Sequence, residues 1–188
     1  MTEIAEVRDN TGKVRSFLGI ILMIVGLFLV YEILAWAIDK RLSSIEEVEA
    51  SQITSKVRER QLTCLARNIY HEAGSEPFEG KVAVAQVTIN RANSDGKFPG
   101  DICKVVYQKN VFYDKVLCQF SWACDRSGKF SPKHKDIYEE SMEVAKRVLL
   151  EGFRLPSLNE ALYFHADYIN PGWKKQRVAK IGRHIFYK

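Results

Sequence analysis

Residues 62–91 read LTCLARNIYHEAGSEPFEGKVAVAQVTINR, and this stretch predicts two consecutive helices. From its start to Ala73, apolar residues recur every three or four positions, which is the spacing of one helix face. Gly74 follows at the position where a left-handed cap would end the first helix. Pro77, a favoured first-turn residue, opens the second helix, whose small and β-branched side chains continue to Arg91 and allow close packing against the first.

Glu72 lies in the last turn of the first predicted helix, at the rim of its apolar face. Partial burial disfavours a carboxylate, and so does the negative end of the helix dipole, so we expect the pKa of Glu72 to be raised. A carboxyl group that keeps its proton near neutral pH can act as a general acid on a glycosidic oxygen. The competing interpretation is a solvated glutamate at a helix end.

Shorter elements follow the two helices. We expect, in order, a short helix over 102–106, a loop-rich stretch over 110–130, an amphipathic helix from Ser131-Pro132 to near Gly152, and strands within 161–165 and 178–187. The pattern therefore predicts an α+β domain that is mainly helical, with a small β element.

A segment of a different kind precedes this domain. Residues 17–38 read FLGIILMIVGLFLVYEILAWAI, 22 residues with one formal charge, Glu32, and no proline. As a helix this segment is about 33 Å long, enough to cross a hydrocarbon core of about 30 Å. We expect a transmembrane signal-anchor helix, because the apolar run has the full spanning length. A cleavable signal peptide with a site at Ala35-Trp36-Ala37 is the alternative.

The chain of 188 residues is accordingly divided into four parts: a cytoplasmic N-terminal segment (1–16), the transmembrane helix (17–38), a charged helical stalk (39–61) and the domain (62–188). The domain carries 20 Lys+Arg and 14 Asp+Glu, a balance of +6, so it accounts for the whole positive excess of the chain, whose net charge is +5. A basic domain suits an anionic polymer such as nucleic acid, a membrane surface or cell wall. Since no nucleic-acid-binding motif occurs, we expect no nucleic-acid partner.

Five blocks occur in order along the domain: LARNIYHEAGSEPFEGKVAVAQVTINR, FPGDICKVVYQ, QFSW, ALYFHA and KIGRHIFY. Together they resemble the SleB-type spore-cortex-lytic cell wall hydrolases of bacteria and phages, over nearly all of residues 62–188. The resemblance implies a lysozyme-like catalytic domain that cleaves peptidoglycan glycan strands between N-acetylmuramic acid and N-acetylglucosamine. It implies a lytic transglycosylase that leaves 1,6-anhydromuramoyl ends. The family's IYxEA motif matches residues 69–73, so the resemblance assigns the catalytic acid/base to Glu72.

The matching blocks also nominate substrate-binding residues. We expect sugar-binding or intermediate-stabilising groups at Tyr70, Gln119, Ser121, Tyr163 and His165, and rings that stack on sugars at Phe120 and Trp173. The chain departs from the family where EARGEP is replaced by EAGSEP at residues 72–77. It departs again in a longer insertion between Gln108 and Gln119.

Three other functions stay open. A lysozyme-type muramidase would use a second carboxylate, for which Asp95, Asp125 and Asp167 are available. A stem-peptide peptidase would pair Cys64, near a helix start, with His165. A non-enzymatic, membrane-anchored wall-binding or lysis-accessory protein is the third.

A zinc amidase is disfavoured, because His71-Glu72 lacks the second histidine of a HExxH helix. His71, His134 and His184 are therefore interpreted as surface or structural residues. We predict no metal and no cofactor. The expected partners are peptidoglycan and, through the N-terminal helix, a membrane; no protein partner is inferred.

Four cysteines in an extracytoplasmic domain predict disulfides. Three pairings are possible. Cys118 with Cys124 would close a short loop, and Cys64 with Cys103 is the complementary pair. The expected location is a membrane-anchored protein with its domain on the periplasmic or extracytoplasmic side.

Overall fold

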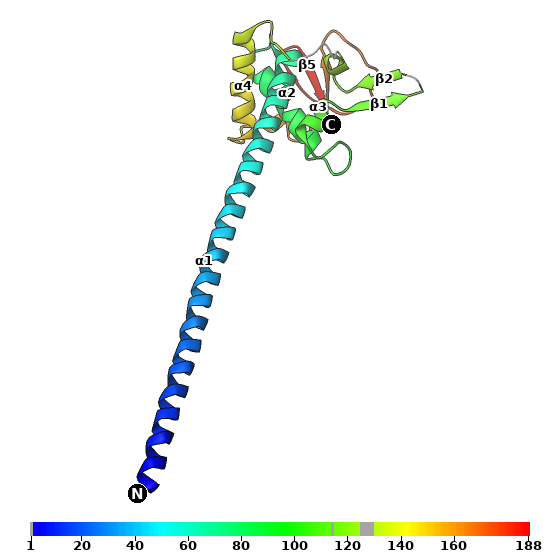
Figure 1. Cartoon of the computed structure of the whole chain (residues 1–188). Coiled ribbons are helices and arrows are strands. Elements are labelled where there is room, and N and C mark those ends of the chain that lie inside the picture. Colours follow the sequence, from blue (N-terminus) through cyan, green and yellow to red (C-terminus); the bar gives the residue numbers. More distant parts are fainter. Residues whose placement is uncertain (1, 114, 125–129) are drawn as a thin grey trace. The chain divides into compact units, whose positions relative to one another are not determined.

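The computed structural model describes residues 2–113, 115–124 and 130–188. Its contacts divide the chain into two compact units, Met1–Thr54 and Ser55–Lys188, which are described separately below. Helix α1 (Thr2–Ala73) contributes to both units (Figure 1). The predicted transmembrane segment, stalk and first domain helix are thus stretches of one continuous helix. Nothing in residues 39–61 stops it, because that stretch contains neither proline nor glycine.

In the first unit, α1 exposes its side chains on every face from Val14 onward. Leu27, for example, is 63% exposed although it lies in the middle of the apolar run. In the described part of the chain, this is the one helix long and apolar enough to cross a membrane. Lys40 lies 5.0 Å from the ring centroid of Trp36, a pairing suited to the membrane interface.

Helix α2 (Phe78–Ala92) is the centre of the second unit. It packs against α3 (Ile102–Val106) and α4 (Lys135–Leu149), and Figure 1 shows α4 alongside it. Every residue of α2 from Gly80 to Ile89 is buried, as its small and apolar composition allows. The main core joins residues from four helices: Leu65, Ile69, Val82, Ala85, Ile102, Val106, Val144 and Val148.

The predicted helix boundaries need small corrections. Pro77 is the N-cap of α2 and lies just outside the helix. α4 begins at Lys135, after an extended N-cap at His134, and therefore starts later than Ser131-Pro132. Gly152 does adopt a left-handed φ of 73° beyond its end.

Gly74 does not have the left-handed conformation expected of it, because its φ angle is not positive. A Cβ atom at this position would lie 2.5 Å from the backbone oxygen of Tyr70 and 3.1 Å from Ile137 Cγ2. The glycine is required there by a close approach of backbone and side chain, not by its φ angle.

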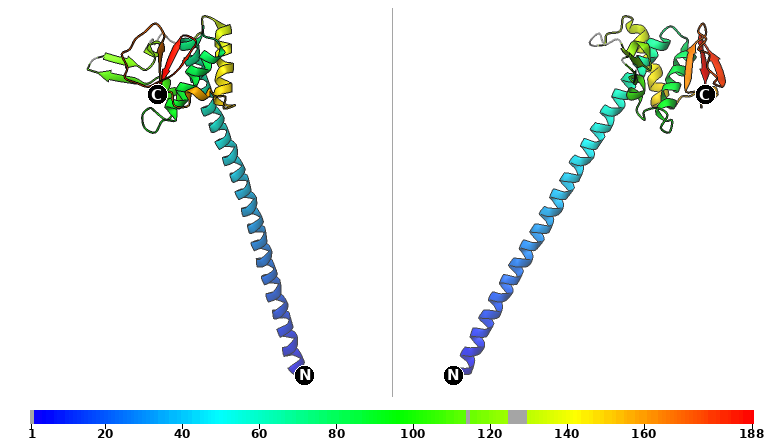
Figure 2. Two further views of the ribbon diagram at one scale, coloured as in Figure 1. Left: turned by 180° about the vertical axis from the view of Figure 1, so that it is seen from behind. Right: turned by 90° about the vertical axis from the view of Figure 1, so that its right-hand side faces the viewer.

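The expected C-terminal strands form a three-stranded antiparallel sheet. It comprises β3 (Tyr163–Ala166), β4 (Arg177–Ile181) and β5 (His184–Tyr187) in the order β3-β5-β4. The right-hand view of Figure 2 shows these orange and red strands along one side of the helices. Phe186 packs with Val87 and Leu158, a residue of the short 3-10 helix η2 (Pro156–Leu158), so one sheet face completes a second small core.

The stretch predicted to be loop-rich contains a β-hairpin. β1 (Lys109–Phe112) pairs with β2 (Lys115–Cys118), and a 3-10 helix, η1 (Ser121–Cys124), follows. The hairpin carries exposed side chains, with Val111 69% exposed, so it lacks the hydrophobic alternation that marks a half-buried strand. Its turn has Tyr113 at a φ of 55° and no glycine, which leaves no turn signal in the sequence.

Two disulfides connect the elements of the second unit. Cys64 of α1 is bonded to Cys103 of α3, with a Cα–Cα distance of 5.3 Å. Cys118 is bonded to Cys124 with a Cα–Cα distance of 5.7 Å, and this bond closes the loop that contains η1. Of the three pairings that the sequence leaves open, the structure has Cys118 with Cys124 and Cys64 with Cys103. Cys64 lies inside α1, not near a helix start, and has no free thiol, so the Cys64/His165 peptidase loses its nucleophile.

Candidate active site

Glu72 is half-buried in the last turn of α1, where the helix meets the rest of the second unit. Burial raises its pKa, while a hydrogen bond from Trp122 and the charge of Arg91 lower it in part. The direction agrees with the expectation drawn from the helix position. A glutamic acid in this setting keeps its proton to a higher pH than a solvated one and can donate it.

Trp122 of η1 is the aromatic neighbour of Glu72. Its ring stacks on His71 with centroids 4.3 Å apart and planes 16° apart. The indole Nε1 is buried and has no partner of normal hydrogen-bond geometry among the described residues. We therefore regard its interaction with Glu72 as a long, weak hydrogen bond that still favours the carboxylate. The disulfide of Cys118 and Cys124 encloses Trp122 and restricts where its ring can lie.

Arg91 supplies the positive charge at the site. Its side chain is buried, with 3% of the residue exposed, and its Nε donates a hydrogen bond to the Leu162 carbonyl oxygen at 2.7 Å. Its guanidinium carbon lies 5.1 to 5.9 Å from the centroids of three phenylalanine rings, those of Phe98, Phe120 and Phe164. Burial lowers the pKa of Arg91 to about 10, so the group remains charged at neutral pH.

Sequence reasoning did not identify Trp122 or Arg91 as site residues. Trp122 directly follows the nominated Ser121, and that adjacency was its one signal. Arg91 ends a helix in the sequence, where a basic residue is commonplace. Its burial depends on rings that are distant in the chain.

Phe120 requires a correction. The sequence nominates its ring for stacking on a sugar, but the residue is 4% exposed. It lies 5.5 Å beneath the guanidinium of Arg91 and 6.4 Å from the ring of Phe164. Phe120 is thus part of the packed interior and has no free ring face for a ligand.

The other residues nominated near η1 have distinct settings. The hydroxyl of Tyr70 accepts hydrogen bonds from the backbone N–H groups of Lys133 and His134, at 3.1 and 3.3 Å, and so holds the chain before α4. Gln119 is half-buried, and Ser121 is exposed at the start of η1.

Tyr163, His165 and Trp173 lie together on the C-terminal sheet and its loop. His165 Nδ1 donates a hydrogen bond to the Ala166 carbonyl oxygen at 2.8 Å, and His165 Nε2 is hydrogen-bonded to the hydroxyl of Tyr187 at 2.9 Å. Trp173 packs edge-on against Tyr163, His165 and Tyr187, with centroids 5.5 to 6.1 Å apart, and is 40% exposed. The ring of Tyr163 also lies 6.1 Å from that of Phe98, one of the rings around Arg91, which connects this aromatic cluster to the surroundings of Arg91.

None of the three candidate second carboxylates is found beside Glu72 in the described part of the chain. Asp95 is exposed in the turn after α2. Asp167 forms ion pairs with Lys180 at 3.0 Å and Arg183 at 3.6 Å, and the hydrogen bond from Lys180 lowers its pKa. Asp125 lies outside the described residues.

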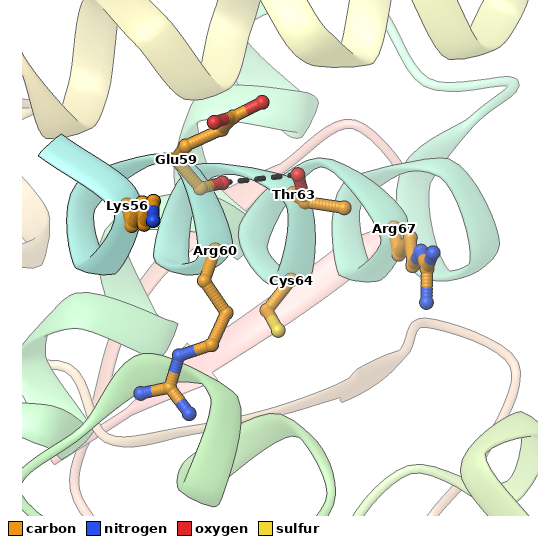
Figure 3. Close-up of a pocket in the computed structure, with 6 residues that line it drawn as sticks. All are labelled: Lys56, Glu59, Arg60, Thr63, Cys64 and Arg67. Carbon is orange, nitrogen blue, oxygen red and sulfur yellow. Dashed lines mark hydrogen bonds between the residues drawn. The ribbon is translucent and has the colours of Figure 1, made fainter. Parts of the chain in front are cut away.

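A hollow of about 410 Å³ lies along α1 and does not include Glu72 among its lining residues. Figure 3 shows Arg60, Cys64 and Arg67 directed to the same side of the helix there. Arg60 forms an ion pair with Asp101 at 2.6 Å.

The described residues hold no group of three or more His, Cys, Asp or Glu side chains arranged for a metal ion. The candidate site is therefore defined by Glu72, Trp122 and Arg91.

A family model described as Cell Wall Hydrolase matches residues 75–187, more than half of the chain. The chain belongs to the cell wall hydrolase family. The matched range begins just after Glu72 and includes Arg91 and Trp122.

Curated relatives of this cell wall hydrolase are spore cortex-lytic enzymes. The enzyme of Oceanobacillus iheyensis is 30% identical over 134 residues, which are 69% of this chain and 42% of the relative. That of Bacillus subtilis is 27% identical over 145 residues, 75% of this chain and 42% of the relative. The chain thus spans about two fifths of the length of these relatives.

Solved structures agree with the family. The catalytic domain of Bacillus cereus SleB matches with a TM-score of 0.50 and 25% identity, over 69% of this chain and 91% of that one. The catalytic domain of the germination-specific lytic transglycosylase SleB from Bacillus anthracis matches with a TM-score of 0.51 and 26% identity, over 68% and 93%. The predicted fold, a mainly helical α+β domain with a small sheet, is confirmed.

Proposed function

We propose that the second unit cleaves the glycan strands of peptidoglycan between N-acetylmuramic acid and N-acetylglucosamine, as a lytic transglycosylase with Glu72 as its single acid/base. The observation that carries this proposal is the setting of Glu72, a half-buried carboxyl group of raised pKa beside Trp122 and Arg91. Family membership supports it, as does the name of the B. anthracis neighbour.

One carboxyl group is sufficient for this reaction. Glu72 gives its proton to the glycosidic oxygen as the bond from that oxygen to C1 of the muramoyl residue breaks. The Glu72 carboxylate then accepts the proton of the muramoyl 6-hydroxyl, whose oxygen forms a new bond to C1. The products are a free 4-hydroxyl on one fragment and a 1,6-anhydro ring on the other, and Glu72 ends protonated. A muramidase would instead place a second carboxylate about 5 to 9.5 Å from Glu72.

We further propose that the substrate contacts the aromatic cluster of Tyr163, His165 and Trp173. The half-exposed ring of Trp173 offers apolar area, and the hydroxyl and imidazole groups beside it offer hydrogen bonds. The exposed Ser121 and half-buried Gln119 precede Trp122 closely in the chain and suit polar contacts near the scissile bond. For Tyr70 we propose a positioning role, because its hydroxyl already accepts two backbone hydrogen bonds.

We place the second unit outside the cytoplasm, anchored by α1. Two disulfides involve all four cysteines, and such bonds form and persist in oxidising compartments. The exposed apolar side chains of residues 17–38 fit a lipid environment. The basic charge of residues 62–188 suits an anionic wall polymer.

Digestion of purified sacculi by the full-length chain in detergent micelles tests the reaction. We expect mass spectrometry to detect anhydromuramoyl ends with the wild type and none with Glu72→Gln. Glu79→Gln, which changes an exposed glutamate in the first turn of α2, is the matched control and should retain activity. Reducing muramic acid ends would indicate a muramidase, and free stem peptides would contradict both glycan-cleaving mechanisms. A folded wild type that releases nothing would support the wall-binding alternative.

A further inference from the structure

Arg91 is a buried charge whose surroundings do not fully satisfy it. Of its nitrogens, Nε has the Leu162 carbonyl as an acceptor, whereas the buried Nη1 has no hydrogen-bond partner among the described residues. Leaving a buried donor unpaired costs about 1 to 3 kcal/mol, and more for a charged group. A hydrophobic side chain of similar length would fill the space between the three phenylalanine rings without that cost.

The positive charge of Arg91 is understandable from the neighbouring Glu72. The ring of Phe120 lies beneath Arg91 and stacks 6.5 Å from the ring of Trp122, which in turn contacts Glu72. The ring of buried Phe120 and the ring of half-buried Trp122 thus connect Arg91 to the surroundings of Glu72. Arg91 and Glu72 make no direct ion pair, so the charge of Arg91 acts on the Glu72 carboxyl group without a hydrogen bond between them. Such an interaction is stronger in an apolar interior than in water.

We propose that Arg91 is a positioning residue of the acid/base cycle, whose buried guanidinium stabilises the Glu72 carboxylate that forms after the proton has left for the glycosidic oxygen. This role rests on the proposed function. The burial that makes Glu72 a competent acid also penalises its anion. Arg91 offsets part of that penalty from a distance and leaves the carboxyl oxygens free for the substrate.

The other groups around the pair do not supply this charge. Trp122 on η1 is neutral, and Tyr163 on β3 has a phenol group, which never carries a positive charge. On α1, burial and the charge of Arg67 lower the pKa of His71, which keeps that ring neutral at neutral pH. Glu76 and His184 face each other at 4.0 Å. Arg91 is the cation that acts on Glu72 within the described part of the chain.

Two neutral variants test the proposal. Arg91→Gln keeps a donor for the Leu162 carbonyl, and Arg91→Met keeps the packing between the phenylalanine rings. Arg91→Lys keeps the charge. Arg147→Gln removes an equal charge from an exposed position on α4, over the ring of Phe78, and serves as the matched control.

The first readout is the titration of the 13C-labelled Glu72 carboxyl by NMR in the full-length chain, assigned by its loss in Glu72→Gln. We expect both neutral variants to move this titration to higher pH by roughly one unit, and Arg91→Lys to move it less. The control should leave it unchanged. Because this readout needs no turnover, it remains valid even if Glu72→Gln proves fully active and the proposed function fails.

The second readout is the pH dependence of glycan cleavage. The acid step requires protonated Glu72, so activity falls as pH rises through its pKa, and this limb should move to higher pH in the neutral variants while the maximal rate falls about tenfold or more. A folded neutral variant with an unmoved Glu72 titration overturns the proposal. Failure of both neutral variants to fold would overturn it too, since Arg91 would then be a structural residue.

Discussion

Glu72 and Glu76 are one helical turn apart in the sequence, and the structure gives them opposite surroundings. Glu76 is 9% exposed, and its Oε2 accepts a hydrogen bond from the backbone N–H of Arg183 at 3.0 Å. Its Oε1 lies 4.0 Å from His184 Nδ1. Glu76 thereby joins the chain just after α1 to the turn between β4 and β5. Glu72 is less buried but has one weak donor, Trp122.

The difference separates a structural carboxylate from a reactive one. The Glu76 carboxylate is engaged in the fold, because its Oε2 accepts a backbone hydrogen bond that joins two distant segments of the chain. A carboxyl group that is desolvated but poorly hydrogen-bonded holds its proton, and its oxygens remain free for a substrate. Burial alone does not distinguish the two residues; the donors do.

Of the substitutions that test the difference between Glu72 and Glu76, we expect Glu72→Gln to have the largest effect, and that effect is on catalysis. Glu72→Gln removes the transferable proton while keeping the shape of the side chain, so we expect glycan cleavage to fall by about 10² to 10⁴-fold. The free energy of unfolding should change by less than about 0.5 kcal/mol, because no strong hydrogen bond is lost. Release of soluble muropeptides and urea unfolding measure the two quantities. Substantial remaining activity would transfer the acid role to another residue.

The next effect is on stability and concerns Glu76. Gly182 and Gly172 both have left-handed backbones, with φ of 54° and 65°. A Cβ atom at Gly182 would lie 1.9 Å from Glu76 Oε2, whereas one at Gly172 would meet nothing within 4 Å. Alanine costs about 1 to 2 kcal/mol at either position for its backbone, and we expect Gly182→Ala to cost about 1 to 3 kcal/mol more.

Thermal unfolding of the two alanine variants measures this difference, and a double variant identifies its origin. In a Glu76→Ala background the excess cost at Gly182 should largely disappear, because the obstructing carboxylate is gone. Equal costs at the two glycines in the wild-type background would mean that Glu76 does not constrain this turn.

How far the sequence predicts these two environments depends on the range of the contacts. The helices around Glu72 follow from local periodicity, and the strands of the C-terminal sheet follow from alternation. The position of Glu72 at the rim of an apolar helix face predicted its partial burial, which is the cause that raises its pKa. Glu76 gave no signal, because its partner Arg183 is 107 residues away in the chain.

The errors share the same origin. Phe120 stands in a matching block, where a buried and an exposed aromatic look alike in sequence. Arg91 and Trp122 acquire their roles from tertiary burial that no local pattern encodes. The hairpin formed by β1 and β2 is exposed, so the hydrophobic pattern that usually reveals a strand is missing.

A smaller effect is expected from the loop that brings Trp122 to Glu72. The double variant Cys118→Ser/Cys124→Ser opens this loop, and we expect cleavage to fall roughly two- to fivefold, the equivalent of a weak hydrogen bond of about 0.5 to 1 kcal/mol. The Glu76 region should be unaffected, so hydrogen exchange at the Arg183 amide should not change. Cys64→Ser/Cys103→Ser is the matched control, expected to lower stability while folded protein keeps its activity. If the Cys118→Ser/Cys124→Ser variant kept full activity, the position of Trp122 would not matter for glycan cleavage.

The smallest effect is a pH dependence of stability that Glu72 alone should contribute. The pKa of Glu72 in the folded chain is raised above 4.5, its ordinary value, which we take for the unfolded chain. The protonated carboxyl group therefore stabilises the fold fully below about pH 4.5, and this contribution is lost as the pH rises through the raised pKa. Glutamine does not titrate. The unfolding free energy of Glu72→Gln relative to wild type should therefore increase from about pH 4 to about pH 8, and that of Glu79→Gln is measured beside it as the exposed control. Urea unfolding of the full-length chain in micelles at several pH values measures both differences. A Glu72→Gln difference that stays flat or decreases with pH would mean that the hydrogen bond from Trp122 and the charge of Arg91 outweigh desolvation, so that the fold would favour the charged form of Glu72.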